Sequence, residues 1–147
     1  MELFGTDGVR GIPGEFPLTA AFVEKLAEAA ARELSPHLKR KRNPSGVSGE
    51  GCAVLMARDT RASGVMLTKA LARGFRKAGC RELVDLGVLP TPGLARLTAA
   101  RRAAFGVVVS ASHNPPEFNG IKFFDGKGGK LDPKLEQRIE KVLGHGR

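Results

Sequence analysis

Apolar side chains recur every three or four residues in several segments, the spacing that places them on one face of a helix. The first such segment covers 19–34, where Thr19 is a residue type that caps helix amino termini and Pro36 discourages continuation. Three further helices are predicted at 63–78, 92–100 and 132–143. Each begins at a capping residue or a proline, which are Ser63, Pro92 and Asp132-Pro133 respectively.

Short continuous apolar runs lie between these segments and predict strands at 52–57, 82–88 and 105–109. Because helices separate them, the strands are expected to be parallel and joined by right-handed crossovers. A further strand is predicted at 120–124, followed by a hairpin in the Gly-rich stretch 125–129. The fold class is therefore α/β, a three-layer α/β/α sandwich with a mostly parallel, mixed sheet, and the whole of residues 1–147 is expected to form one domain.

The amino-acid composition argues against a membrane-spanning protein. Hydrophobic residues make up 41% and charged residues 27%, and no apolar run approaches the ~20 residues that span a bilayer. The amino terminus also lacks the pattern of a signal peptide, so we expect a cytoplasmic protein without a membrane partner. Cys52 and Cys80 lack the spacing of a zinc site and are predicted to be packed thiols.

The formal net charge of +9 favours anionic partners. Nucleic acid is not the expected partner, because the chain has no Trp or Tyr and its eight Phe do not alternate with Lys and Arg as stacking platforms do. Much of the charge lies in the run 39–42, which is interpreted as a solvated loop, with a nuclear address or a nucleic-acid patch as the alternative.

The segment Ser110-Ala111-Ser112-His113-Asn114-Pro115 directly follows the predicted strand 105–109. Strand ends of this kind line the ligand crevice of open α/β sheets. Ser112 and His113 are neighbours, which point apart in an extended loop, and no G-x-S-x-G motif is present, so an acyl-transfer hydrolase is not expected. A phosphorylated serine brings roughly −1.5 to −2 charge and suits a cationic surface. The loop is therefore predicted to be a phosphate carrier.

Two further segments, 58–61 and the one that contains Lys122, are expected beside the Ser112 loop. Arg58-Asp59-Thr60-Arg61 follows the first predicted strand, at the same sheet edge as Ser112, although Asp59 has the alternative of pairing locally with Arg58 or Arg61. Lys122 is interpreted in three ways, as a cation beside a transferring phosphoryl group, as a general base, or as an ordinary strand lysine.

The opening Phe4-Gly5-Thr6-Asp7-Gly8-Val9-Arg10-Gly11 combines glycines with a single arginine. Its glycines permit close approach of the backbone to a neighbouring group, and the Thr6 side chain offers a hydroxyl. The Arg10 guanidinium offers paired N–H donors that fit a phosphate. The alternative is a structured turn in which Arg10 pairs with Asp7.

Together these segments resemble the α-D-phosphohexomutases. Ser-His-Asn-Pro-Pro followed by Asn-Gly-Ile-Lys is similar to that family's phosphoserine loop, and Phe-Gly-Thr-Asp-Gly-Val-Arg-Gly to its phosphoglucosamine mutase branch. The resemblance implies that Ser112 carries the phosphate exchanged with a phosphorylated hexosamine through a 1,6-bisphosphate. It also implies catalytic roles for Arg10, His113 and Lys122, and substrate or phosphate binding by Thr6, Asp7, Arg58 and Asn114.

The family's Mg²⁺ is implied to take one ligand from phosphorylated Ser112 and the others from an Asp-Gly-Asp-Gly-Asp-Arg loop of a second domain, a loop that this sequence lacks. The implied partners are the remaining domains of the same enzyme, with a homodimer of the full-length enzyme as an option. We expect no mutase turnover from these 147 residues alone. The alternatives are a phosphoglucomutase or phosphomannomutase domain, or a non-catalytic basic domain that binds phosphate or nucleic acid.

Overall fold

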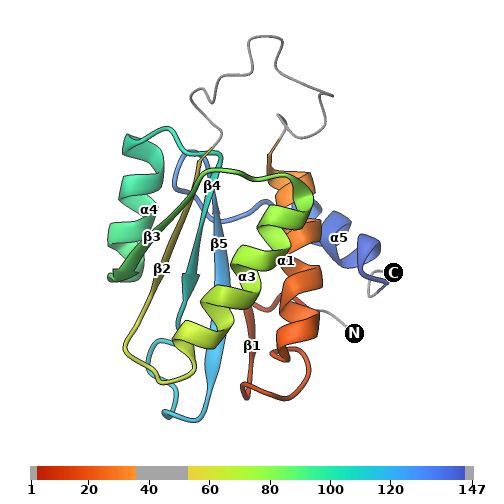
Figure 1. Ribbon diagram of the computed structural model, residues 1–147, viewed down its shortest axis with the longest axis vertical. Helices are drawn as coiled ribbons and strands as arrows, with labels where there is room; N and C mark the ends of the chain where they lie inside the picture. The colour runs from red at the N-terminus through yellow and green to blue at the C-terminus, as the bar shows by residue number, and fades with distance from the viewer. Residues whose placement is uncertain (1–2, 36–52, 145–147) are drawn as a thin grey trace.

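A five-stranded sheet with helices on both faces organises the chain (Figure 1). The computed structural model describes residues 3–35 and 53–144. Its elements, in chain order, are β1 (Val9–Gly11), α1 (Ala20–Leu34), β2 (Val54–Arg58), α3 (Gly64–Ala78), β3 (Leu83–Val88), α4 (Thr91–Ala100), β4 (Phe105–Val109), β5 (Asn119–Asp125) and α5 (Pro133–Val142).

The sheet has the strand order β1-β5-β4-β2-β3. β2 pairs in parallel with both β3 and β4, which confirms the predicted β-α-β-α-β unit. β5 runs antiparallel to β4 and to β1, so four of the five strands point the same way. β1 is not predicted from the sequence, where the opening segment has the pattern of a Gly-rich turn.

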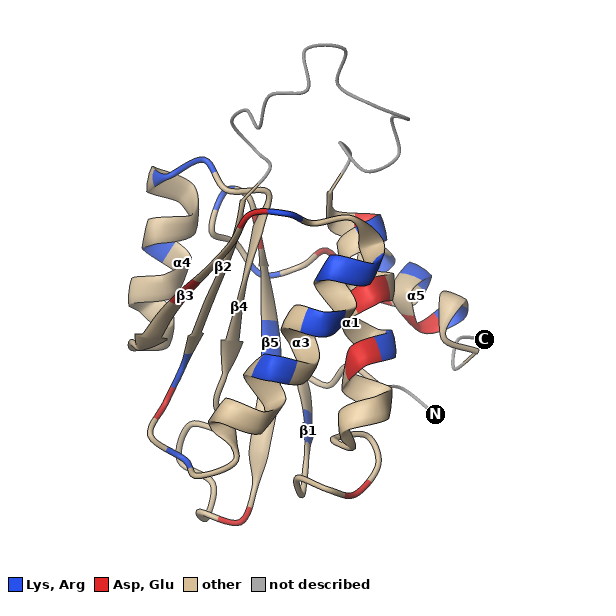
Figure 2. Ribbon diagram, viewed as in Figure 1, with Lys and Arg blue, Asp and Glu red and all other residues tan. Residues whose placement is uncertain are grey.

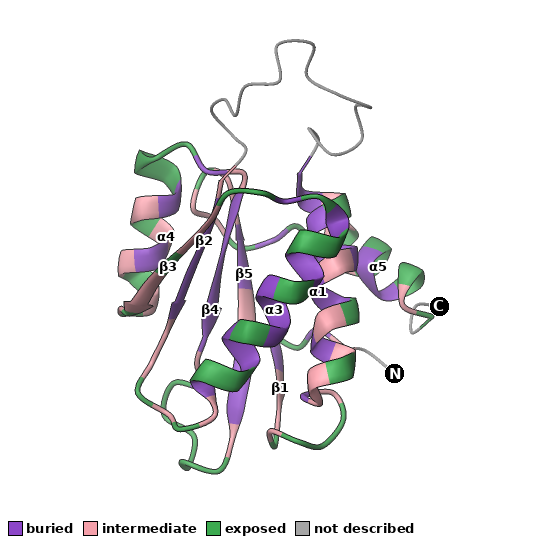
Figure 3. Ribbon diagram, viewed as in Figure 1, coloured by how far each residue is buried: buried purple, intermediate pink, exposed green. Residues whose placement is uncertain are grey.

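The three predicted layers are confirmed. Residues of β2 alternate between two apolar cores, with Val54 and Met56 in the core beneath α1 and α3, and Leu55 and Ala57 in the core beneath α4. Ile139 brings α5 into the first core, beside α1. Figure 3 shows that β2, β4 and the inner helix faces are largely buried, whereas the edge strand β3 is only partly buried and the loops that follow β2 and β4 are exposed.

Helix termini follow the sequence signals with one exception. The Thr19 hydroxyl accepts from the Phe22 amide at 3.1 Å, and the Asp132 carboxylate accepts from the Lys134 amide at 2.8 Å. The prediction that Ser63 caps α3 is wrong: the residue has helical dihedral angles (φ −75°, ψ −8°) and its side chain makes no capping bond. Its hydroxyl instead accepts a bond from the Asn119 side chain at 2.8 Å.

Basic residues form a row along α3, which contains Lys69, Arg73, Arg76 and Lys77 and no acidic residue (Figure 2). Glu24 of α1 pairs with Arg73 at 3.2 Å and also with Lys77. Cys80 is buried, as predicted.

Two sequence predictions, the basic run 39–42 and the packing of Cys52, lie outside the described residues. Within the described ranges, no helix is both long and apolar enough to cross a membrane.

Candidate functional site

The carboxyl ends of β2 and β4 and the start of β5 meet at one edge of the sheet, the lower edge in Figure 1. The loop that joins β4 to β5 carries Ser112, and the segment after β2 carries Asp59 and Arg61. The Asp59 amide donates to the Val109 carbonyl at 3.0 Å, which ties the two strand ends together. The predicted meeting of these two segments is confirmed.

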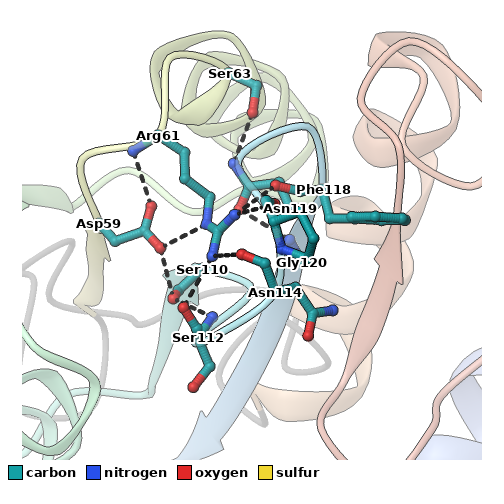
Figure 4. Close-up of polar contacts among 10 residues, drawn as sticks. Asp59, Arg61, Ser63, Ser110, Ser112, Asn114, Phe118, Asn119 and Gly120 are labelled. Carbon is teal, nitrogen blue, oxygen red and sulfur yellow. Dashed lines mark hydrogen bonds and ion pairs between the residues drawn. The ribbon is translucent and has the colours of Figure 1, made fainter.

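Arg61 lies at the centre of this site (Figure 4). Its Nη1 donates to the carbonyls of Pro115 at 2.7 Å and Phe118 at 3.1 Å, and its Nη2 to those of Ser112 and Asn114, both at 2.9 Å. One guanidinium thus binds four backbone carbonyls of a single loop, a geometry that its rigid planar fork of donors allows.

Asp59 links this guanidinium to the serine end of the loop. Its Oδ2 accepts from Arg61 Nε at 3.0 Å and from the Ser110 hydroxyl at 2.8 Å, and Ser110 Oγ accepts from the Ser112 amide at 3.0 Å. Burial acts to raise the pKa of Asp59, but bonds from the Arg61 amide, the Ser110 hydroxyl and the Arg61 guanidinium together lower it. Asp59 is therefore a carboxylate at neutral pH, and of its two predicted local partners it pairs with Arg61.

Ser112 has a left-handed backbone, with φ +57°. The prediction that Ser112 and His113 lie in an extended loop is therefore wrong, because both are turn residues. No described residue contributes a hydrogen bond to the Ser112 hydroxyl, which points away from the Arg61 network (Figure 4). Ser112, His113 and Asn114 are all exposed, so a phosphoryl group can reach the hydroxyl.

Thr6 and Asp7 form the exposed tip of a tight turn between Gly5 and Gly8, whose backbones bond to each other at 3.0 and 3.3 Å. Gly8 has φ +92°, and a Cβ there would lie 2.3 Å from the Ile121 carbonyl oxygen. Only glycine lets this turn pack against β5. Thr6 and Asp7 are thereby held beside the strand that carries Lys122.

Arg10 pairs across β1 and β5 with Gly120, whose carbonyl accepts the Ser110 amide at 2.9 Å. A Cβ at Gly120 would lie 3.0 Å from Arg10 Cγ and 2.8 Å from the Ser110 carbonyl oxygen, so glycine gives the arginine stem its place at the loop. Arg10 Nε is buried without a hydrogen-bond partner in the described part of the chain. The alternative pairing of Arg10 with Asp7 does not occur in that part of the chain.

In the described part of the chain, neither the Arg58 nor the Lys122 side chain forms a hydrogen bond or ion pair with the Ser112 loop. Arg58 pairs with Asp85 of β3 at 3.3 Å. Lys122 Nζ lies 5.6 Å from the centroid of the Phe124 ring, a cation–π contact further along β5 from the site. Their proposed roles at the phosphate remain predictions.

The described residues do not form a complete Mg²⁺ site. They contain no group of three or more His, Cys, Asp or Glu side chains placed to hold a metal ion. Asp59 is already engaged by Arg61 and Ser110. Mg²⁺ prefers near-octahedral oxygen ligands, so phosphorylated Ser112 would supply one ligand and the rest would have to come from elsewhere.

Three side chains of the site are not identified as functional by the sequence. Arg61 is expected there only as a partner of Asp59, and Ser110 and Asn119 have no assigned role. Asn119 is fully buried and joins β5 to α3 through its bond to Ser63. The available signal is position, because Arg61 and Ser110 both lie at the carboxyl ends of strands that the sequence predicts to be neighbours.

Comparison with known proteins identifies the family of this chain. The model of the family "Phosphoglucomutase/phosphomannomutase, alpha/beta/alpha domain I" matches residues 1–146. The phosphoglucosamine mutase of Chromobacterium violaceum is 52% identical over 142 residues, and that of Verminephrobacter eiseniae is 50% identical over 141. These matches cover 97% and 96% of this chain but only 30% and 28% of the relatives' lengths.

A solved structure supports the same assignment. The crystal structure of a putative phosphomannomutase from Thermus thermophilus superposes with a TM-score of 0.77 at 34% identity, covering 95% of this chain and 29% of that one. The match over residues 1–146, the shared fold and the loop at the sheet edge lead to one conclusion. This chain belongs to the phosphoglucomutase/phosphomannomutase family and corresponds to its α/β/α domain I.

Proposed function

We propose that this chain is the phosphoserine-bearing domain of a phosphoglucosamine mutase, which interconverts glucosamine 6-phosphate and glucosamine 1-phosphate. The observation that carries the proposal is Ser112, an exposed serine at the ligand edge of the sheet whose backbone is bonded on both sides while its hydroxyl is left without a partner among the described residues. The phosphoglucosamine mutase names of the two relatives, about half identical to this chain, favour that branch.

The proposed reaction is two phosphoryl transfers at one oxygen. In the first, the bond between phosphorus and Ser112 Oγ breaks as phosphorus bonds to the sugar's C1 oxygen, and the C1 hydroxyl gives up its proton to a base. In the second, the 6-phosphate leaves its sugar oxygen for Ser112 Oγ, and the sugar oxygen regains a proton. The protein's contribution to such transfers is positioning and charge stabilisation.

Cations are proposed to stabilise the phosphate. Arg10 is suited to this role because its buried Nε has no partner in the described structure, and a guanidinium binds phosphate through two parallel bonds. Lys122 is proposed as the proton donor and acceptor once its flexible stem swings from Phe124 toward the loop. His113, Asn114, Thr6, Asp7 and Arg58 are proposed as further contacts with the phosphate or the sugar.

Turnover in a full-length enzyme tests this proposal. The chain replaces the matching domain of the Chromobacterium violaceum enzyme, and glucosamine 1-phosphate formation is measured. We expect turnover that Ser112→Ala lowers by at least about 1,000-fold, because the transferred group loses its carrier. Thr60→Ala, which removes an exposed hydroxyl next to Asp59, should leave turnover unchanged. Equal turnover in Ser112→Ala and Thr60→Ala would overturn the proposal.

A further inference from the structure

We infer that Arg61, Asp59 and Ser110 form a clamp on the backbone of Ser112, and that Arg61 and Ser110 are positioning residues for phosphoryl transfer. The inference rests on the proposed function, because it assigns these side chains to the same serine. None of the three is placed in contact with sugar or phosphate. Their action is on the main chain that carries the reacting hydroxyl.

Both backbone polar groups of Ser112 are held by side chains of one network. Ser110 Oγ accepts from the Ser112 amide at 3.0 Å, and Arg61 Nη2 donates to the Ser112 carbonyl at 2.9 Å. Asp59 joins the two ends by accepting from the Ser110 hydroxyl at 2.8 Å and from Arg61 Nε at 3.0 Å. The closed path fixes a left-handed serine, a conformation that residues with a side chain seldom adopt.

Arg61 is not available to bind substrate. A guanidinium has five N–H donors, and Arg61 uses them on four loop carbonyls and on Asp59. Its side chain is only 10% exposed, and its charge is balanced by Asp59 at 3.0 Å. An arginine close to a phosphate carrier is commonly interpreted as a phosphate ligand, but the bonding of Arg61 assigns it to the loop instead.

The proposed reaction explains why the backbone of Ser112 needs to be held in one position. Ser112 alternates between a neutral hydroxyl and a phosphate of about −2 charge, in a region that also contains the unpartnered Arg10 Nε. A loosely held loop would be drawn toward such a cation each time the phosphate forms. Because four of its carbonyls are anchored on Arg61, the loop can keep Oγ in one place through both transfers.

Variants of Ser110 and Arg61 test the clamp by two measurements. Amide hydrogen exchange over residues 112–118 is measured on this chain, and kcat and KM are measured on the full-length enzyme that carries it. Ser110→Ala should speed exchange of the Ser112 amide and lower kcat about 10-fold. Arg61→Lys should speed exchange across the loop and lower kcat about 100-fold, since misplacement of about 1 Å costs this much. KM should stay within about twofold in both variants, since neither side chain contacts the sugar.

Ser110→Thr is the matched control, because it keeps a hydroxyl at the same position and should retain both exchange protection and kcat. The Tm of each variant separates positioning from loss of fold. The inference is overturned if kcat of Ser110→Ala and Arg61→Lys equals that of the parent, or if it falls only in proportion to unfolded protein. If the parent enzyme has no turnover, the proposed function fails, and unchanged exchange over 112–118 in both variants then refutes the clamp separately.

Discussion

Two serines of one loop have opposite environments, and this difference assigns their roles. The Ser110 hydroxyl donates to Asp59 at 2.8 Å, so a phosphate on Ser110 would lie against a carboxylate. The Ser112 hydroxyl is exposed and has no partner among the described residues. Like charges at such distances repel strongly away from bulk water. Phosphate is therefore disfavoured on Ser110 and accommodated on Ser112, although only two residues separate them.

The same carboxylate makes the stability of the site depend on pH. Burial acts to raise the pKa of Asp59, but bonds from the Arg61 amide, Ser110 and the Arg61 side chain hold it below the ordinary value of 3.8. A lowered pKa in the folded chain contributes stability that is complete above the unfolded value and is lost as the pH falls through the folded value.

We therefore expect the parent chain to exceed Asp59→Asn in free energy of unfolding by about 1 kcal/mol at pH 7. The difference should shrink as the pH falls below the ordinary Asp value of 3.8 and through the lowered pKa of the folded chain, because protonation makes the carboxyl group neutral like the Asn side chain. Urea unfolding of the two chains at several pH values measures it. Lys77 and Arg73 also lower the pKa of Glu24. Glu24 is present in both chains, so its contribution to the pH dependence of stability cancels in the comparison. A difference that does not shrink as the pH is lowered below 3.8 would contradict the assignment.

At the scale of elements, the contact between α1 and α3 sets the shape of the larger core. It depends on Gly74, where a Cβ would lie 2.2 Å from the Glu24 carbonyl oxygen and 2.6 Å from the Ala27 Cβ. Backbone atoms cannot yield as a flexible side chain can. The two helices therefore pack this closely only with glycine at this position.

Gly74→Ala is expected to lower the free energy of unfolding by about 2 kcal/mol, because it forces α1 and α3 apart. Gly93→Ala in α4 is the matched control, since the atoms nearest to its Cβ would belong to the flexible side chain of Leu89, at 3.3 Å or more. That variant should be neutral or stabilising by up to about 1 kcal/mol, through better helix propensity. Chemical denaturation measures both. Equal effects of the two substitutions would show that the close approach of the helices does not matter.

Most elements are predictable because each buries a face that its own residues encode. The helix 20–34 and the strand 105–109 show this plainly, as apolar spacing or a continuous apolar run marks each one. β1 is missed because three residues have no readable period and its strand character comes from pairing with β5, more than 100 residues away. Ser63 does not cap α3 because its backbone is already helical, and its hydroxyl is bonded by Asn119, which is also remote in sequence.

Within the site, Ser112 and the segment 58–61 can be placed from strand ends alone, whereas the choice of Arg61 over Arg58 as the partner of Asp59 cannot. The loop bonds of Arg61 cannot, because their acceptors are backbone carbonyls between 51 and 57 residues away, and any residue type supplies a carbonyl. The left-handed backbone of Ser112 cannot be predicted from the sequence for a similar reason. It depends on how the loop folds over Arg61 rather than on the identity of the serine.

At the scale of the whole molecule, the chain matches domain I of its family and spans 28–30% of the phosphoglucosamine mutases of Verminephrobacter eiseniae and Chromobacterium violaceum. The described residues bring together no metal-holding cluster, and Arg10 Nε is buried without a partner among them. A phosphoserine needs several ligands and cations around it for transfer. We therefore expect these 147 residues to carry the phosphate but to show no mutase turnover by themselves.

The most direct measurement is the site of phosphate on the protein. The full-length enzyme that carries this chain is incubated with glucosamine 1,6-bisphosphate, and its peptides are mapped by mass spectrometry. The account predicts one phosphate on Ser112 and none on Ser110. Phosphate on Ser110, or an unmodified loop in an enzyme that turns over, would contradict it.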